Sequence, residues 1–106
     1  METGEYYIRR GTAKDPNAPG GILARLEERK DDGNHEAEWR TSYWAFCNDE
    51  AFYHRANVHV KEEDLLGSYK IVDKDEALKI LMKEVDGKIL YYEGVRAADI
   101  KLEDTP

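Results

Sequence analysis

Residues 36–60 read EAEWRTSYWAFCNDEAFYHRANVHV and hold both tryptophans, both phenylalanines and the only cysteine of the chain. Apolar and polar residues alternate on either side of Asn48-Asp49, which is the pattern of two half-buried strands joined by a turn. The segment contains neither proline nor glycine. We therefore predict a β-hairpin with Trp39 and Tyr43 on one face and Trp44 on the other.

A further strand is predicted ahead of this hairpin. Residues 22–29, ILARLEER, alternate in the same way and lead into Asp32-Gly33-Asn34, a typical turn sequence. A four-residue loop there would pair Lys30 with His35 and Leu26 with Trp39. The apolar residues of both strands then lie on one face.

The same counting around Asn48-Asp49 pairs Tyr43 with His54, Trp44 with Tyr53, and Trp39 with Val58. A slip of one residue in either hairpin would turn the apolar residues to opposite faces. The agreement of the two registers predicts a three-stranded antiparallel meander over residues 22–29, 36–46 and 51–60.

The rest of the chain adds strands near residues 5–10, 68–72 and 88–92, a single helical turn near 61–67, and an exposed loop at 11–21 that is rich in proline and glycine. Asp73 and Glu76 form a capping-box-like start for a helix over 74–86. Because Asp86-Gly87 is also a hairpin turn sequence, residues 77–92 could instead form two strands.

The predicted fold is α+β, a twisted antiparallel sheet in one domain of residues 1–106, with 103–106 as a frayed tail. We expect the main helix to pack on the sheet face that presents four apolar, aromatic or histidine side chains: Trp39, Tyr43, His54 and Val58.

The composition of the chain limits the classes of function that it could have. Of the 106 residues, 41% are hydrophobic and 37% charged, which allows a core and argues against a membrane span. The net charge of −7 disfavours nucleic-acid binding, which needs a concentrated positive field. One cysteine and an N-terminus unlike a secretion signal fit a reducing compartment, so we expect a cytoplasmic protein.

The face opposite the predicted core is the candidate binding surface. It combines aromatic and arginine side chains, which are enriched at the energetic centres of protein interfaces. These residues are Trp44, Tyr53, Arg40, Arg55, Phe46 and Arg25. The alternatives are that another strand, the C-terminal segment or a second copy in a homodimer covers this face.

No cofactor or catalytic motif is found, and the sequence favours a protein-binding module, such as an inhibitor, an immunity-type protein or an accessory protein, over an enzyme. Two other classes stay open: an acidic inhibitor that mimics nucleic acid, and a small hydrolase that uses His54. Cys47 and the histidines lack the spacing of a metal site, so no metal is expected.

Overall fold

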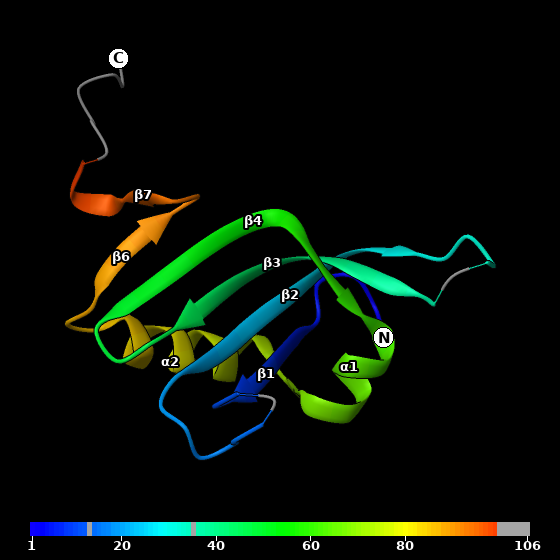
Figure 1. The fold of residues 1–106 in the computed structure, drawn as a ribbon, viewed down its shortest axis with the longest axis horizontal. Helices are drawn as coiled ribbons and strands as arrows, with labels where there is room; N and C mark the ends of the chain where they lie inside the picture. Colours follow the sequence, from blue (N-terminus) through cyan, green and yellow to red (C-terminus); the bar gives the residue numbers. More distant parts are fainter. Residues whose placement is uncertain (13, 35, 100–106) are drawn as a thin grey trace.

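The computed structural model describes residues 1–12, 14–34 and 36–99. Seven strands form one sheet in the order β5-β1-β2-β3-β4-β6-β7. The elements are β1 (Tyr6–Arg10), β2 (Gly21–Lys30), β3 (Glu38–Phe46), β4 (Glu50–Lys61), α1 (Glu62–Ser68), β5 (Lys70–Val72), α2 (Lys74–Val85), β6 (Ile89–Tyr92), β7 (Val95–Arg96) and a short 3-10 helix (Ala97–Asp99). Figure 1 shows the two helices at different ends of the sheet.

The α+β class and the β2-β3-β4 meander are confirmed, but the sheet is not purely antiparallel. Strand β6 pairs with β4 in parallel, whereas its neighbour β7 is antiparallel to it. The reason is the route of the chain, which reaches β6 through helix α2 and not through a hairpin. Parallel neighbours require such a long connection, usually a helix.

The hairpin between β3 and β4 has the predicted register at its tip. Tyr43 pairs with His54 and Trp44 with Tyr53. Beyond Tyr43 the register shifts, so that Trp39 lies opposite Val60 instead of Val58. The shift is a bulge in β4, which alternation alone does not reveal because a shift of two residues keeps every side chain on its face.

The predicted register between β2 and β3 is wrong by three residues next to the loop and by two residues beyond an irregularity between Leu26 and Glu28. Lys30 pairs with Glu38 and not with His35, which lies outside the described residues, and Leu26 pairs with Thr41 and not with Trp39. The connecting loop is longer than the four residues assumed. Gly33 and Asn34 donate their backbone N–H groups to the side chains of Asp31 and Asp32 at 3.0 and 2.9 Å, so these aspartates shape the turn.

Ala56 lies at the centre of the β4 bulge in a left-handed backbone conformation, with φ of 52°. The Ser42 hydroxyl accepts a hydrogen bond from the Ala56 N–H at 2.8 Å, and Arg40 Nη1 donates to the Ala56 carbonyl, also at 2.8 Å. Such a conformation is costly for a residue with a Cβ, so it persists only where its surroundings fix it. Two side chains of β3 fulfil that role here.

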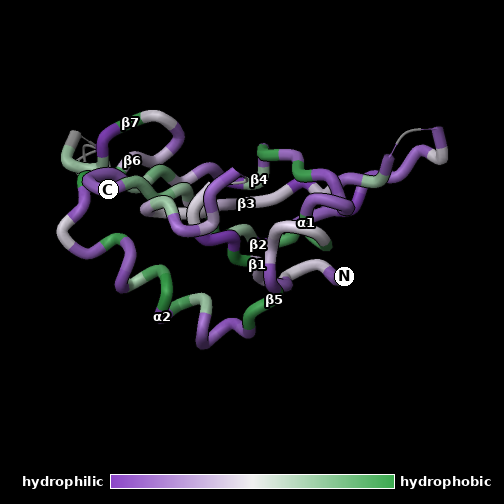
Figure 2. The backbone as a smooth tube through the Cα atoms, turned by 60° about the horizontal axis from the view of Figure 1, so that its bottom comes forward, coloured by the Kyte–Doolittle hydropathy of each residue, from purple (hydrophilic) through white to green (hydrophobic). Residues whose placement is uncertain are grey.

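Helix α2 forms as predicted, and the alternative hairpin over 77–92 is not adopted. The Asp73 side chain accepts a hydrogen bond from the backbone N–H of Glu76 at 2.8 Å, which confirms the predicted cap. The helix runs from β5, at one edge of the sheet, to β6, next to the strand at the other edge, and forms a separate layer with apolar turns (Figure 2).

The prediction of which sheet face α2 covers is wrong. Ala77 and Ile80 of α2 pack on Ile8, Leu23 and Phe46, and not on the face of Trp39, Tyr43, His54 and Val58. We call the covered surface the helix face. Both faces carry aromatic and polar side chains, so the alternation pattern did not distinguish them.

The opposite surface has a cover only at one end. There, Leu65 of α1 joins Tyr7, Leu26 and Trp39 in a second core cluster, in which Trp39 is only 3% exposed. We call the remainder of this side, which presents Tyr43, Phe52, His54 and Tyr91, the open face, because no described helix lies over it (Figure 1).

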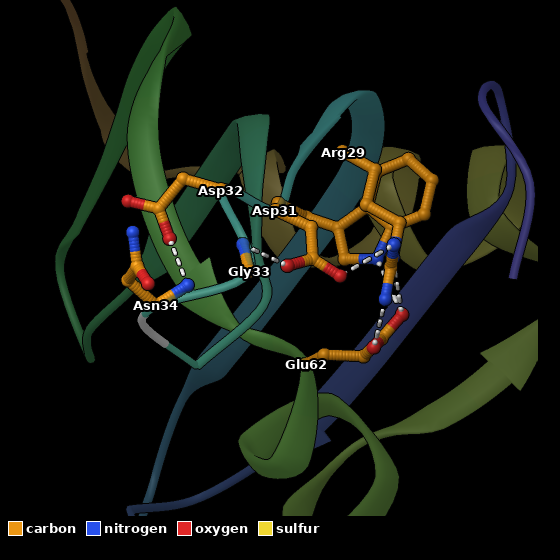
Figure 3. A network of polar contacts seen from close by, with 7 residues as sticks. Arg29, Asp31, Asp32, Gly33, Asn34 and Glu62 are labelled. Atoms are coloured by element: carbon orange, nitrogen blue, oxygen red, sulfur yellow. Dashed lines mark hydrogen bonds and ion pairs between the residues drawn. The ribbon is translucent and has the colours of Figure 1, made fainter.

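The carboxylate of Glu62, the first residue of α1, accepts hydrogen bonds from three nitrogen atoms and so holds this second cluster together. Arg29 binds the Glu62 carboxylate with two nitrogens at 3.1 Å each, and the Trp39 indole N–H donates to it at 3.2 Å. Figure 3 shows the Arg29 guanidinium between the carboxylates of Glu62 and Asp31. The hydrogen bonds from Arg29, followed by that from Trp39, hold the pKa of Glu62 below its usual value.

The loop predicted at 11–21 has turns and bends but no helix or strand in its described residues before Gly21, where β2 begins. The frayed tail predicted at 103–106 lies outside the described residues.

A candidate binding groove between α2 and the sheet

A cavity of about 170 Å³ opens between α2 and the helix face of the sheet. Strands β1, β2, β3 and β4 supply one wall and α2 supplies the other. The lining residues are Tyr6, Leu23, Arg25, Ser42, Trp44, Tyr53, Ala77, Leu78 and Leu81. The arrangement is a groove with an apolar floor and a few polar groups at its edge, as in many ligand sites.

Aromatic rings form the sheet side of the groove. The ring centroid of Trp44 lies 5.0 Å from that of Tyr53 and 5.6 Å from that of Tyr92, and the second pair is edge-to-face. The parallel strand β6 brings Tyr92 to this position, since it pairs with Tyr53. Rings at these distances stabilise one another and give a broad, rigid surface with little entropy to lose on binding.

Two polar side chains lie beside the rings. Arg25 is half exposed, and its guanidinium is 3.7 Å from the Glu27 carboxylate. Ser42 is buried and its hydroxyl oxygen accepts the hydrogen bond from the Ala56 N–H, which leaves its O–H group able to donate. The groove therefore offers a cation and a hydroxyl donor next to an apolar cavity.

Helix α2 extends the apolar surface beyond the cavity. Leu78 is 43% exposed and Met82 is 72% exposed, and a spacing of four residues places them on one side of the helix. Leu78 also lines the cavity. Exposed apolar side chains that adjoin a cavity form a contiguous patch, and such patches often mark binding sites.

The structure brings half of the predicted binding residues into this groove. Trp44, Tyr53 and Arg25 line it. Phe46 is buried in the core under α2, Arg40 is engaged with the Ala56 carbonyl and with Glu28 at 4.0 Å, and Arg55 is exposed outside the lining. The surface is thus smaller than predicted, because α2 occupies part of the face that we expected to be free.

The helical wall of the groove was not predicted from the sequence. Ser42 shares a face with Trp44 by alternation, so strand parity could have found it, whereas Tyr6 joins that face only through the pairing of β1 with β2. Leu78 and Leu81 belong to the predicted helix, which was expected on the other sheet face. No signal in one sequence tells which of two aromatic faces a helix will cover.

The open face is the second aromatic surface. Tyr43 and His54 have ring centroids 5.5 Å apart, and the rings of Phe52 and Tyr91 stack at 5.0 Å. At its edge the Arg9 guanidinium lies 5.5 Å from the ring centroid of Tyr69, where its Nε atom is buried without a hydrogen-bond partner in the described part of the chain.

His54, the residue of the predicted enzyme alternative, lies on this open face. Its Nδ1 atom is 3.7 Å from the Glu93 carboxylate, which is beyond hydrogen-bond distance, and that carboxylate accepts a hydrogen bond from the Arg55 backbone N–H. His54 does not line the groove. Cys47 is exposed at the turn between β3 and β4. Among residues 1–12, 14–34 and 36–99, no group of histidine, cysteine and carboxylate side chains is arranged to hold a metal.

Acidic and basic side chains are interspersed around the β2-β3 loop. A broad cavity of about 710 Å³ near the β2-β3 loop is lined by charged residues of both signs, Lys30, Asp31, Asp32, Glu36, Glu38 and Lys61. Lys61 pairs with Glu36 at 3.6 Å and His59 with Glu38 at 3.3 Å. This surface is therefore mixed in charge and not a continuous acidic strip.

The chain matches no family model, no curated protein and no solved structure. Within the described residues, no helix is both long and apolar enough to cross a membrane. The groove, its aromatic wall and Arg25 are the features from which a function can be inferred.

Proposed function

We propose that this protein is a small protein-binding module that captures another protein in the groove between α2 and the aromatic wall of the sheet. Inhibitors, immunity-type proteins and accessory subunits work in this manner. We place its action in the cytoplasm, where a single exposed thiol such as Cys47 stays reduced.

The observation that carries the proposal is the coincidence of a cavity with exposed apolar side chains around it. Trp44 and Tyr53 lie within the cavity, and Leu78 and Met82 continue the surface outward. Large aromatic residues beside arginine supply most of the binding energy at protein interfaces. A partner seated here would remove from water the apolar side chains that the fold leaves exposed.

A nucleic-acid mimic is supported less well, because its acids would have to be free to attract a basic partner. Here Asp31 and Glu62 are held by Arg29, and Glu36 by Lys61. Opposite charges so close to one another weaken the field that would steer a basic protein.

The test compares two leucines of different helices. Leu78 borders the groove, whereas Leu66 of α1 is 74% exposed and does not line it. Immobilised wild-type protein, Leu78→Glu and Leu66→Glu are used to capture partners from the native host, and each captured protein is then titrated against all three in purified form. We expect Leu78→Glu to weaken binding at least tenfold and Leu66→Glu to leave it unchanged.

The result that would overturn the proposal is equal binding by wild type and Leu78→Glu. Size-exclusion chromatography of the same proteins separates a homodimer from a foreign partner. If wild type is dimeric and Leu78→Glu is monomeric, the groove serves self-association instead.

A further inference from the structure

We propose that the partner presents a short acidic segment in which one aromatic side chain enters the cavity and the carboxylate of the following residue pairs with Arg25. This inference rests on the proposed function and specifies the chemistry of the occupant. It is drawn from the volume of the cavity, the charge at its edge and the extent of the apolar surface around it.

The volume of the cavity fits one ring. A dry apolar cavity of about 150 Å³ in another protein binds benzene, and the cavity here measures about 170 Å³. Leu23, Leu81 and Ala77 provide apolar contacts, and the neighbouring Trp44 ring favours a second ring at its edge. A single phenyl group would fill this space, whereas two would not fit.

The charge at the edge of the cavity selects an acid. Arg25 is the one charged residue among the described residues that line it. Its present partner Glu27 is 3.7 Å away and the Arg25 side chain is half exposed, so this ion pair is weak and can be exchanged. An incoming carboxylate could accept two parallel hydrogen bonds from the guanidinium, and the Ser42 hydroxyl provides a further donor.

The extent of the surrounding surface favours a protein segment over a free small molecule. A ligand the size of the cavity would leave the exposed Met82, the outer part of Leu78 and the ring of Tyr92 in water. A peptide that carries its aromatic residue into the cavity would cover these side chains with its flanking residues. We therefore assign the groove to a peptide segment with an aromatic residue followed by an acidic one.

The experiment uses three synthetic peptides as probes: acetyl-Gly-Phe-Glu-Gly-amide, the same peptide with glutamine in place of glutamate, and the same peptide with alanine in place of phenylalanine. The protein carries 5-fluorotryptophan, so Trp44 and Trp39 each give one fluorine NMR signal. Because Trp39 is buried in the other cluster, its signal is an internal control.

We expect the Phe-Glu peptide to shift the Trp44 signal and leave the Trp39 signal unchanged. The peptide that lacks the carboxylate should bind about tenfold more weakly, as should the Phe-Glu peptide to Arg25→Gln, because each change removes the same charge-assisted contact. Arg25→Gln should bind the peptide that lacks the carboxylate no more weakly than either single change weakens binding. Arg96→Gln, which alters an exposed arginine outside the groove, is the matched control.

Several results would overturn the inference. Equal affinity for the Phe-Glu and Phe-Gln peptides would show that Arg25 does not bind a carboxylate. An equal shift of the Trp44 signal with the alanine peptide would show that no aromatic side chain enters the cavity. Binding of phenylacetate as tight as that of the Phe-Glu peptide would assign the cavity to a small molecule. If Leu78→Glu nevertheless abolishes capture of the natural partner, the binding function stands and only this account of the occupant fails.

Discussion

Replacement of Trp39 by alanine should be among the most destabilising single changes in this protein. Its side chain is 3% exposed and packs with Leu26 and Leu65, both fully buried. Truncation of a buried tryptophan costs about 3–5 kcal/mol, since it removes apolar contacts and leaves a cavity. The Glu62 carboxylate would in addition lose the indole N–H as a donor.

Trp44→Ala provides the comparison. Trp44 is only half-buried and already borders an open cavity, so its removal enlarges a space that water can enter. We expect a loss of about 2 kcal/mol, because less apolar area returns to water and no closed void is created. The two tryptophans belong to clusters on opposite faces, so the losses in the double variant should add.

Urea unfolding followed by far-UV circular dichroism measures both losses, since tryptophan fluorescence changes with the substitutions themselves. Trp39→Phe separates the indole hydrogen bond from the packing, and it should cost about 1–2 kcal/mol. Equal losses for Trp39→Ala and Trp44→Ala, or a larger loss for Trp44→Ala, would contradict this assignment of the two clusters.

Three further outcomes follow from polar contacts and from the backbone conformation that they hold. Since the folded pKa of Glu62 is lowered, its ionised form stabilises the fold above the unfolded pKa of about 4.3, and this stabilisation is lost as the pH falls through the folded pKa. The melting temperature of wild type should therefore fall more than that of Glu62→Gln between about pH 5 and about pH 3. Parallel curves for the two proteins would contradict this. The comparison with Glu62→Gln is needed because other carboxyl groups also titrate here, among them Glu63, whose pKa is raised by Glu36. Ser42→Ala should cost about 1–2 kcal/mol, because it leaves the Ala56 N–H without its acceptor. In the same urea titrations, Ala56→Gly should be neutral or stabilising by less than about 1 kcal/mol, and a clear loss would argue against the left-handed conformation.

Alternation predicted the meander because each strand has one apolar face. The strands themselves can be recognised from this alternation even where the predicted pairing is wrong by a few residues. Trp44 lies opposite Tyr53 as expected. The bulge at Ala56 was not predicted, because the groups that hold it are Ser42 and Arg40 on a neighbouring strand. The residues next to Ala56 in the sequence do not indicate a bulge. Long-range polar contacts of this kind have no periodic signature.

The candidate site was half predicted for a similar reason. Aromatic and arginine side chains on one strand face are visible in the sequence, and Trp44, Tyr53 and Arg25 do lie together. The position of α2 depends on β5 pairing with β1, a contact between segments that are far apart in the sequence. Because two faces of similar composition competed for the helix, the choice was decided by tertiary packing and could not be made from the pattern.

The route of α2 has a consequence for local unfolding. The helix begins next to β5 at one edge of the sheet and ends next to β6, the last strand but one at the other side, so it connects two short strands that do not touch each other. If α2 detached from the helix face, β5 and β6 would lose their support at once, while the longer strands β2 and β3 would keep their ladder. In amide hydrogen exchange, β5, α2 and β6 should then open as one cooperative unit with a lower free energy than the central meander. A partner bound in the groove would hold this unit closed. Slower amide exchange in β5 and β6 would then indicate that the groove is occupied, although these strands lie away from the contact.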